Sequence, residues 1–234
     1  MPKLVALDPQ AHCDVKIALD KTQAVSEILN MVPVVLSEFA NLVVQFPILF
    51  SKSTETGQFV CVALMGLEKG HNLFWRNNQF DSIYLPLNIT RQPFFAGQAD
   101  NHTDEHVIVI DLDNPAIAKK GEALFSTEGK ATPYLKQMQS QLYLLAEGQY
   151  ETSTFIEKII EFDLLVSLKL DITYENGHKH TVNGLYSIDE EKLSELLDEQ
   201  LLDLQHSGYM RLIHTQLASL GQIYALIDKK NKLN

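Results

Sequence analysis

This sequence has little cysteine and little basic charge. Its two cysteines, Cys13 and Cys61, form no Cys-x-x-Cys pair, which argues against a disulfide framework and against a thiolate metal site. The 19 lysine and arginine residues are outnumbered by 30 aspartate and glutamate residues, and the formal net charge is −11. Because a nucleic-acid-binding protein neutralises phosphates with a basic surface, we expect no nucleic-acid partner.

A long uninterrupted apolar run is also missing. A membrane-spanning helix needs about 20 consecutive apolar residues, but the longest candidate, residues 31–50, is interrupted by polar residues such as Ser37 and Glu38. Asp8 and Pro9 stand where a signal peptide would have its continuous apolar segment. We therefore expect a cytoplasmic protein without a membrane span.

The short motifs of nucleotide-binding loops and of serine hydrolases are absent as well. The glycines at positions 66, 70 and 97 match neither the phosphate-loop pattern nor the dinucleotide-binding pattern. No G-x-S-x-G motif marks a nucleophile. We predict no cofactor for this chain.

An apolar, aromatic-rich block at residues 32–95 is the most prominent feature that the sequence does contain, and we expect it to form the core. Pro33 opens an apolar pattern at i, i+4, i+7 and i+8 spacing, which predicts a helix over residues 33–45. Runs of strand-forming side chains predict three strands, two of them joined in a hairpin. These strands are residues 46–50, 59–65 and 107–112.

The chain is mostly helical in pattern from Thr132 onward. Thr132 and Pro133 suit the cap and first turn of a helix that reaches about residue 146, and Thr152 or Ser153 suits the cap of a second helix. The apolar stripe of the last helix packs in the core or forms the seam of a homodimer. The helices expected after Thr152 are residues 154–163, a helix with a capping box at 187–190 that ends at Gly208, and residues 213–227.

A β-hairpin is expected among these helices, with strands at residues 166–174 and 179–186. The Asn176-Gly177 dipeptide between them is typical of a type I′ turn. No linker-like stretch separates the two halves of the chain. The sequence therefore predicts a single α+β domain over residues 1–234, with antiparallel β-structure in the first half and helices packed around a β-hairpin in the second half.

Residues of metal-ligand type are concentrated at positions 100–106. Read as H-x-x-E-H from His102 to His106, they match an inverted zinc-protease motif. Read as His102 and Asp104 with a distant His178 or His180, they match the two-histidine, one-carboxylate triad of iron oxygenases. A solvated acidic loop with incidental histidines is the interpretation we favour, so no metal site is predicted.

Polar side chains embedded in the apolar block are the better candidates for a binding site. Buried polar groups must be hydrogen-bonded or functional. They can satisfy loop carbonyls or pair with one another, or they can line a small-molecule pocket floored by aromatic side chains. The candidate ligand-binding residues are Glu38, His71, Asn72, Trp75, Tyr84 and Arg91.

An ordered series of short motifs resembles the SapC family of bacterial proteins. The resemblance covers nearly the whole chain, and residues 102–106 are not part of it. The motifs are Val32-Pro33, Glu38-Phe39-Ala40, residues 46–50, Leu64-Met65-Gly66-Leu67, Asn72-Leu73-Phe74, Tyr84-Leu85-Pro86, Arg91-Gln92-Pro93-Phe94, Ile110-Asp111, residues 121–125, Gly184-Leu185-Tyr186 and Leu217-Ala218-Ser219-Leu220.

The resemblance implies an accessory role and gives no catalytic residues. The family name points to surface-layer proteins, and relatives tend to be encoded near flavin-dependent halogenase-like enzymes, cupin-type oxygenases and TonB-dependent receptors. Members are often labelled peptide transporter permeases, which does not fit a chain without membrane spans. We therefore expect an accessory or interaction protein whose partner is a halogenase-like or oxygenase-like enzyme or a surface component. The alternatives are a small-molecule-binding protein or enzyme using Asn72, Trp75, Tyr84 and Arg91, and a metal-dependent oxygenase.

Overall fold

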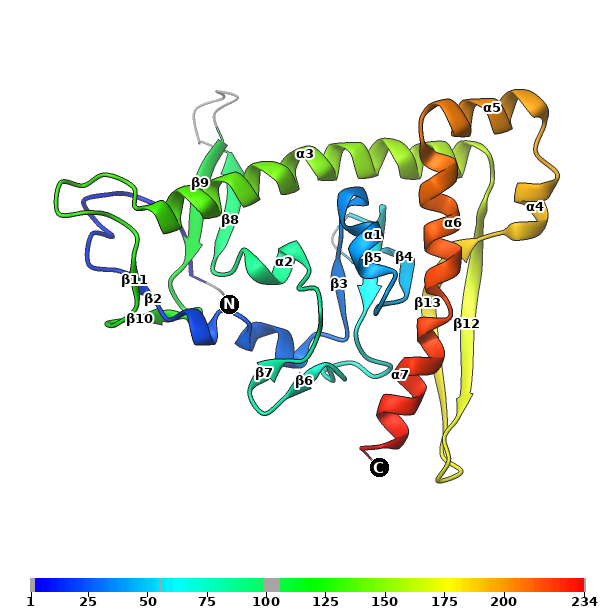
Figure 1. Cartoon of the computed structure of the whole chain (residues 1–234), viewed down its shortest axis with the longest axis horizontal. Helices are drawn as coiled ribbons and strands as arrows, with labels where there is room; N and C mark the ends of the chain where they lie inside the picture. The colour runs from blue at the N-terminus through cyan, green and yellow to red at the C-terminus, as the bar shows by residue number, and fades with distance from the viewer. Residues whose placement is uncertain (1–2, 55, 99–105, 234) are drawn as a thin grey trace.

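A five-stranded antiparallel sheet joins the two halves of the chain (Figure 1). The computed structural model describes residues 3–54, 56–98 and 106–233. Leu185 and Tyr186 pair with Ser51 and Phe50, so the second-half hairpin continues the first-half hairpin. The order is β12-β13-β4-β5-β3, with β3 at Met31–Pro33, β4 at Ile48–Lys52, β5 at Phe59–Leu64, β12 at Leu165–Thr173 and β13 at Lys179–Ile188.

Three smaller sheets come from the first half of the chain. With the seven α-helices of the described residues they confirm the α+β class. The first has the order β1-β9-β8, from Leu4–Ala6, His106–Asp111 and Phe94–Gln98; the second has the order β10-β2-β11, from Ile117–Ala118, Lys16–Ile17 and Glu122–Ala123; the third pairs β6, Trp75–Arg76, with β7, Gln79–Phe80.

One long helix, α3 (Pro133–Glu161), runs along the whole molecule from the small sheets to the C-terminal helices (Figure 1). Thr132 caps it as predicted, with its hydroxyl oxygen accepting from the Leu135 N–H at 3.3 Å. The prediction of two helices with a cap at Thr152 or Ser153 is wrong. Thr152 donates instead to the Gly148 carbonyl at 2.6 Å, one turn back, so its hydroxyl is accommodated inside the helix.

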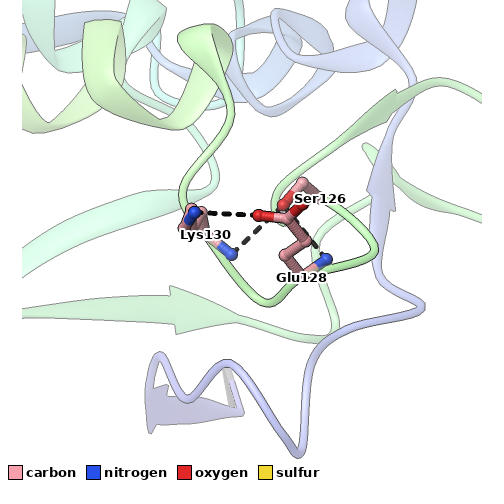
Figure 2. A network of polar contacts seen from close by, with 3 residues as sticks. All are labelled: Ser126, Glu128 and Lys130. Carbon is pink, nitrogen blue, oxygen red and sulfur yellow. Dashed lines mark hydrogen bonds and ion pairs between the residues drawn. The ribbon is translucent and has the colours of Figure 1, made fainter.

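The turn that leads into α3 is shown in Figure 2. The Ser126 hydroxyl oxygen accepts from the backbone N–H groups of Glu128 at 3.3 Å and Lys130 at 3.2 Å. Lys130 also forms an ion pair with Glu128 at 2.8 Å, but both side chains are exposed. Because exposed ion pairs add little stability, the serine hydroxyl is the main side-chain support of this turn.

The apolar interior consists of two clusters, and α3 contributes to both. Leu135, Met138 and Leu142, in the first half of α3, pack in the smaller cluster with the β1-β9-β8 sheet. Phe155, Ile156 and Ile159, near its end, pack in the larger cluster with the five-stranded sheet. The middle of α3 therefore lies at the junction between the two clusters.

Four short helices follow β13, where the sequence predicts two longer ones. Of these, α6 packs on β13 and β4, and α5 packs on α6. Asp189, not Ser187, caps the first of them, because Ser187 is buried in β13. Two side chains of α6 bind the backbone of Ile48 in β4. Gln216 donates to the Ile48 carbonyl at 2.9 Å, and the Ser219 hydroxyl oxygen accepts from the Ile48 N–H at 2.8 Å. The helices are α4 at Glu190–Ser194, α5 at Asp198–His206, α6 at Tyr209–Ser219 and α7 at Gln222–Asn231.

Two further local predictions are wrong. Pro33 ends strand β3 by pairing with Val62, so the helix predicted over residues 33–45 is reduced to short turns. The hairpin between β12 and β13 has a positive φ at Gly177 but not at Asn176, so the turn is not of type I′. The Asn176 side chain accepts a hydrogen bond from the His178 N–H. The short helices that precede α3 in the described residues are η1 at Leu19–Lys21, η2 at Ala24–Ile28, η3 at Leu36–Glu38, α1 at Phe39–Leu42 and α2 at Leu87–Thr90.

The strands predicted at residues 59–65, 107–112, 166–174 and 179–186 are confirmed within a residue or two, and residues 46–50 correspond to β4. Among the described residues, no helix combines the length and the apolar character needed to cross a bilayer.

Candidate functional site

Glu38 is the most deeply buried of the predicted site residues, with 1% of its surface exposed. Its Oε2 accepts from the Val35 N–H at 3.0 Å, and its Oε1 accepts from the Leu87 N–H at 2.7 Å and from the Tyr84 hydroxyl at 3.0 Å. Burial raises the pKa of Glu38, because an ionised carboxylate loses its hydration there. All three donors belong to the fold, so this carboxylate ties η3 to the start of α2.

Asn72, Trp75 and His71 lie in the segment that follows β5. The Asn72 side chain donates to the Ser26 carbonyl at 2.8 Å and accepts from the Phe74 N–H at 2.9 Å. Trp75 is half-buried, pairs with Phe80 and packs against the larger cluster, whereas His71 is exposed. Asn72 therefore satisfies loop backbone groups.

Arg91 follows α2 and is held by three contacts. Its Nε donates to Asn88 Oδ1 at 2.7 Å, and its Nη1 donates to the Phe94 carbonyl at 2.6 Å. Its guanidinium lies over the Phe95 ring, 4.1 Å from the ring centroid. Burial lowers the pKa of Arg91 to about 10, so the group remains charged at neutral pH.

No carboxylate pairs with Arg91 in the part of the chain that the structure describes. Its Nη2 donates to no group among those residues. Arg91 does not contact Glu38. Within the described part of the chain, one nitrogen of this fixed, charged guanidinium therefore has no partner.

Arg91 lines a groove of about 450 Å³ between α3 and the strands below it. The walls include Leu145, Gln149 and Ile156 of α3 and Phe59 of β5. The lining also includes residues 33–35, Asn88, the start of β8, and Ser53, Thr56 and Gln58 between β4 and β5. This volume is in the range that proteins use to bind small molecules, and the groove lies where the two apolar clusters meet.

Two contacts fix the distance between α3 and the segment that follows β3. Gly148 packs so closely on Val35 that a Cβ atom added to it would lie 3.0 Å from the Val35 side chain. One turn further along the helix, the Thr152 hydroxyl oxygen accepts from the Leu36 N–H at 3.1 Å. These two contacts therefore set the distance between α3 and this wall of the groove.

The described lining of this groove combines apolar side chains with a comparable share of polar ones. Among the described residues that line the groove, Arg91 is the only one with a charged side chain. Asn88, Gln149 and Gln58 add amide groups. In a chain with a net charge of −11, a lining with a cation and no carboxylate among its described residues favours an anionic ligand.

The sequence indicates Arg91 as a candidate but not the rest of this lining. Of the six predicted ligand-binding residues, Arg91 alone lines the groove. Glu38 accepts a hydrogen bond from the backbone of Val35, a lining residue, and Tyr84 donates to Glu38. Asn88 and Gln149 were missed because single polar residues on helices are ordinary surface residues. The spacing of Asn88 three residues before Arg91 is the one local signal for that pair.

The structure describes only some of the metal candidates. His102 and Asp104 lie outside the described residues, and so does the side chain of His106. His178 stacks on Tyr174, with ring centroids 6.1 Å apart, and His180 forms a hydrogen bond to the Leu67 carbonyl through Nε2 at 2.9 Å. Within residues 3–54, 56–98 and 106–233, no group of three or more histidine, cysteine, aspartate or glutamate side chains has a metal-binding arrangement.

Comparison with known proteins gives one result. The SapC family model matches residues 7–226 of the chain. The comparisons with curated proteins and with solved structures found no match to the chain.

Proposed function

Because the chain belongs to the SapC family and Arg91 is the one charged side chain among the described residues of its groove, we propose that it is an accessory protein that binds a small anion with an apolar body. The observation that carries this proposal is Arg91, fixed by Asn88, Phe94 and Phe95 with Nη2 left over. The apolar side chains beside it, such as Leu145 and Ile156, suit the body of the ligand.

Binding fits this groove better than acid–base catalysis. Its described lining residues include no carboxylate and no imidazole, the groups that most often transfer protons in active sites. The three donors bound to Glu38 leave that carboxylate no role toward a ligand. Cys61 lines the groove but is buried, and burial raises the pKa of its thiol, which keeps it protonated and unreactive.

The accessory role in this proposal is what the resemblance to the SapC family implies. In this proposal the protein works in the cytoplasm and carries the anion for a modification, uptake or surface-layer system. A halogenase-like or oxygenase-like enzyme is the partner to test first, because such enzymes act on small molecules that a carrier can present.

Displacement of a fluorescent probe tests the proposal. Anilinonaphthalene sulfonate is an anion with an apolar body, and its fluorescence rises when it enters an apolar site. We expect decanoate to displace it from the protein, and decanol or decylammonium to displace it at least about tenfold less well, because a charge-assisted hydrogen bond is worth about 1.5–3 kcal/mol. Equal displacement by all three compounds, or no probe binding, contradicts the proposal.

A further inference from the structure

A second hollow of about 440 Å³ lies on α3 beside the β8–β9 hairpin. Its floor is apolar and is formed by Val107, Ile108 and Leu142. It shares Leu142, Ala96 and Ala146 with the groove of Arg91, so the two hollows adjoin at the contact between α3 and β8. The proposed function does not use this second hollow.

Its polar rim comes from one face of α3. Gln139, Tyr143 and Glu147 follow each other at intervals of four residues and therefore lie on the same side of the helix. The Tyr143 hydroxyl donates to Glu147 Oε1 at 2.5 Å. The Tyr143 ring is 61% exposed and stands beside the opening.

Glu147 has no cationic partner among the described residues. Its Oε1 accepts the bond from Tyr143, and its Oε2 has no hydrogen-bond partner in the described part of the chain. The same bond raises the pKa of Tyr143, so the phenol stays protonated and remains a donor to the carboxylate. Among the described residues, the charge at this rim is thus negative and without an ion-pair partner, opposite in sign to the Arg91 charge in the groove.

We propose that this hollow binds a small organic cation, an amine with an apolar body. The ammonium group lies against the Glu147 carboxylate and the face of the Tyr143 ring, which attract a cation by charge and by the ring quadrupole. The apolar body lies on Val107, Ile108 and Leu142. This site is distinct from the proposed anion site, since its charged group comes from a different residue and lines a different hollow, although the two hollows share part of their walls.

Titration with phenylbutylammonium, followed by the methyl NMR signals of Val107 and Ile108, tests the site. We expect saturable shifts with wild-type protein and an affinity at least about tenfold lower for Glu147→Gln, which removes the charge and keeps the shape. Glu157→Gln is the matched control, because Glu157 is exposed on the same helix and lies outside the hollow; it should leave the affinity unchanged. Phenylbutanol, the neutral analogue, should bind at least about tenfold more weakly than the amine.

Three further variants separate this site from others. Tyr143→Phe keeps the ring and should retain binding within about threefold, whereas Tyr143→Ala should weaken it by about tenfold because the ring face is lost. Arg91→Gln should bind the amine with the affinity of the wild type, even if this variant no longer binds the anion. Absence of saturable shifts at millimolar amine, or equal affinity of Glu147→Gln and wild type, would overturn the proposal without affecting the anion site.

Discussion

Thr152, in the middle of α3, accepts a hydrogen bond from the backbone N–H of Leu36 at 3.1 Å, across 116 residues of sequence. The same hydroxyl donates to the Gly148 carbonyl at 2.6 Å, so both functions of the group are used. Both residues are buried. This contact fixes α3 to the segment that carries Glu38, and it sets the width of the groove beside Arg91.

Thr152→Val should therefore destabilise the protein by about 1–3 kcal/mol, because the buried Leu36 N–H loses its partner while the side chain keeps its shape. The free energy of unfolding from urea titration measures this. Thr154→Val is the matched control, since Thr154 also bonds to a carbonyl one turn back, Tyr150 at 3.2 Å, but is exposed. Similar losses in both variants would show that the contact with Leu36 does not stabilise the fold.

Glu38 should give the stability a specific dependence on pH. Its folded pKa is raised above 4.5, its ordinary value, by burial. The folded state therefore binds a proton more tightly than the unfolded state, and stability falls as pH rises from about 4.5 through the folded pKa. Urea titrations between pH 4.5 and 8 should show the stability margin of wild type over Glu38→Gln shrinking as pH rises. A margin that grows with pH would contradict the assignment.

Glu38→Gln itself should destabilise the protein at every pH of that range. The glutamine amide has one acceptor oxygen, while the fold presents donors at Val35, Leu87 and Tyr84. At least one buried donor is left unpaired, at a cost of about 1–3 kcal/mol. A variant as stable as wild type would show that these three bonds add no net stability.

The groove should respond to a charge placed on its α3 wall. Gln149 is exposed, and its side chain forms no hydrogen bond among the described residues, so Gln149→Glu should fold normally. The added carboxylate should lower the affinity for decanoate by about tenfold, because it repels the anion and competes for Arg91. Gln137→Glu, also exposed on α3 but outside the groove, is the control. Unchanged affinity in Gln149→Glu would place the anion elsewhere.

Local patterns predicted much of the fold. The strands at residues 59–65, 107–112 and 166–174 were found because each has a run of strand-forming residues bounded by turn residues. The unbroken length of α3 was missed, because its middle is stabilised by contacts of Gly148 and Thr152 with residues 35 and 36, far away in sequence. A pattern within a short window contains no information on such contacts.

The groove was predictable only in part for the same reason. Arg91 stood out as a charge in apolar sequence, and the structure places it at the wall of a hollow. β8 follows Arg91 closely in sequence, but the other walls come from β5 and α3, which are distant from Arg91 in sequence and meet it only after folding. Glu38 stood out equally, yet its partners are three donors of the fold and not a ligand.

The affinity of Arg91→Gln for decanoate, compared with that of Arg211→Gln, tests the central claim most directly. Both variants lose one positive charge, but Arg211 is exposed on α6 and outside the groove. Calorimetry should show at least about tenfold weaker binding for Arg91→Gln and wild-type binding for Arg211→Gln, with both variants folded by circular dichroism. Equal affinities in the two variants would contradict the anion site at Arg91.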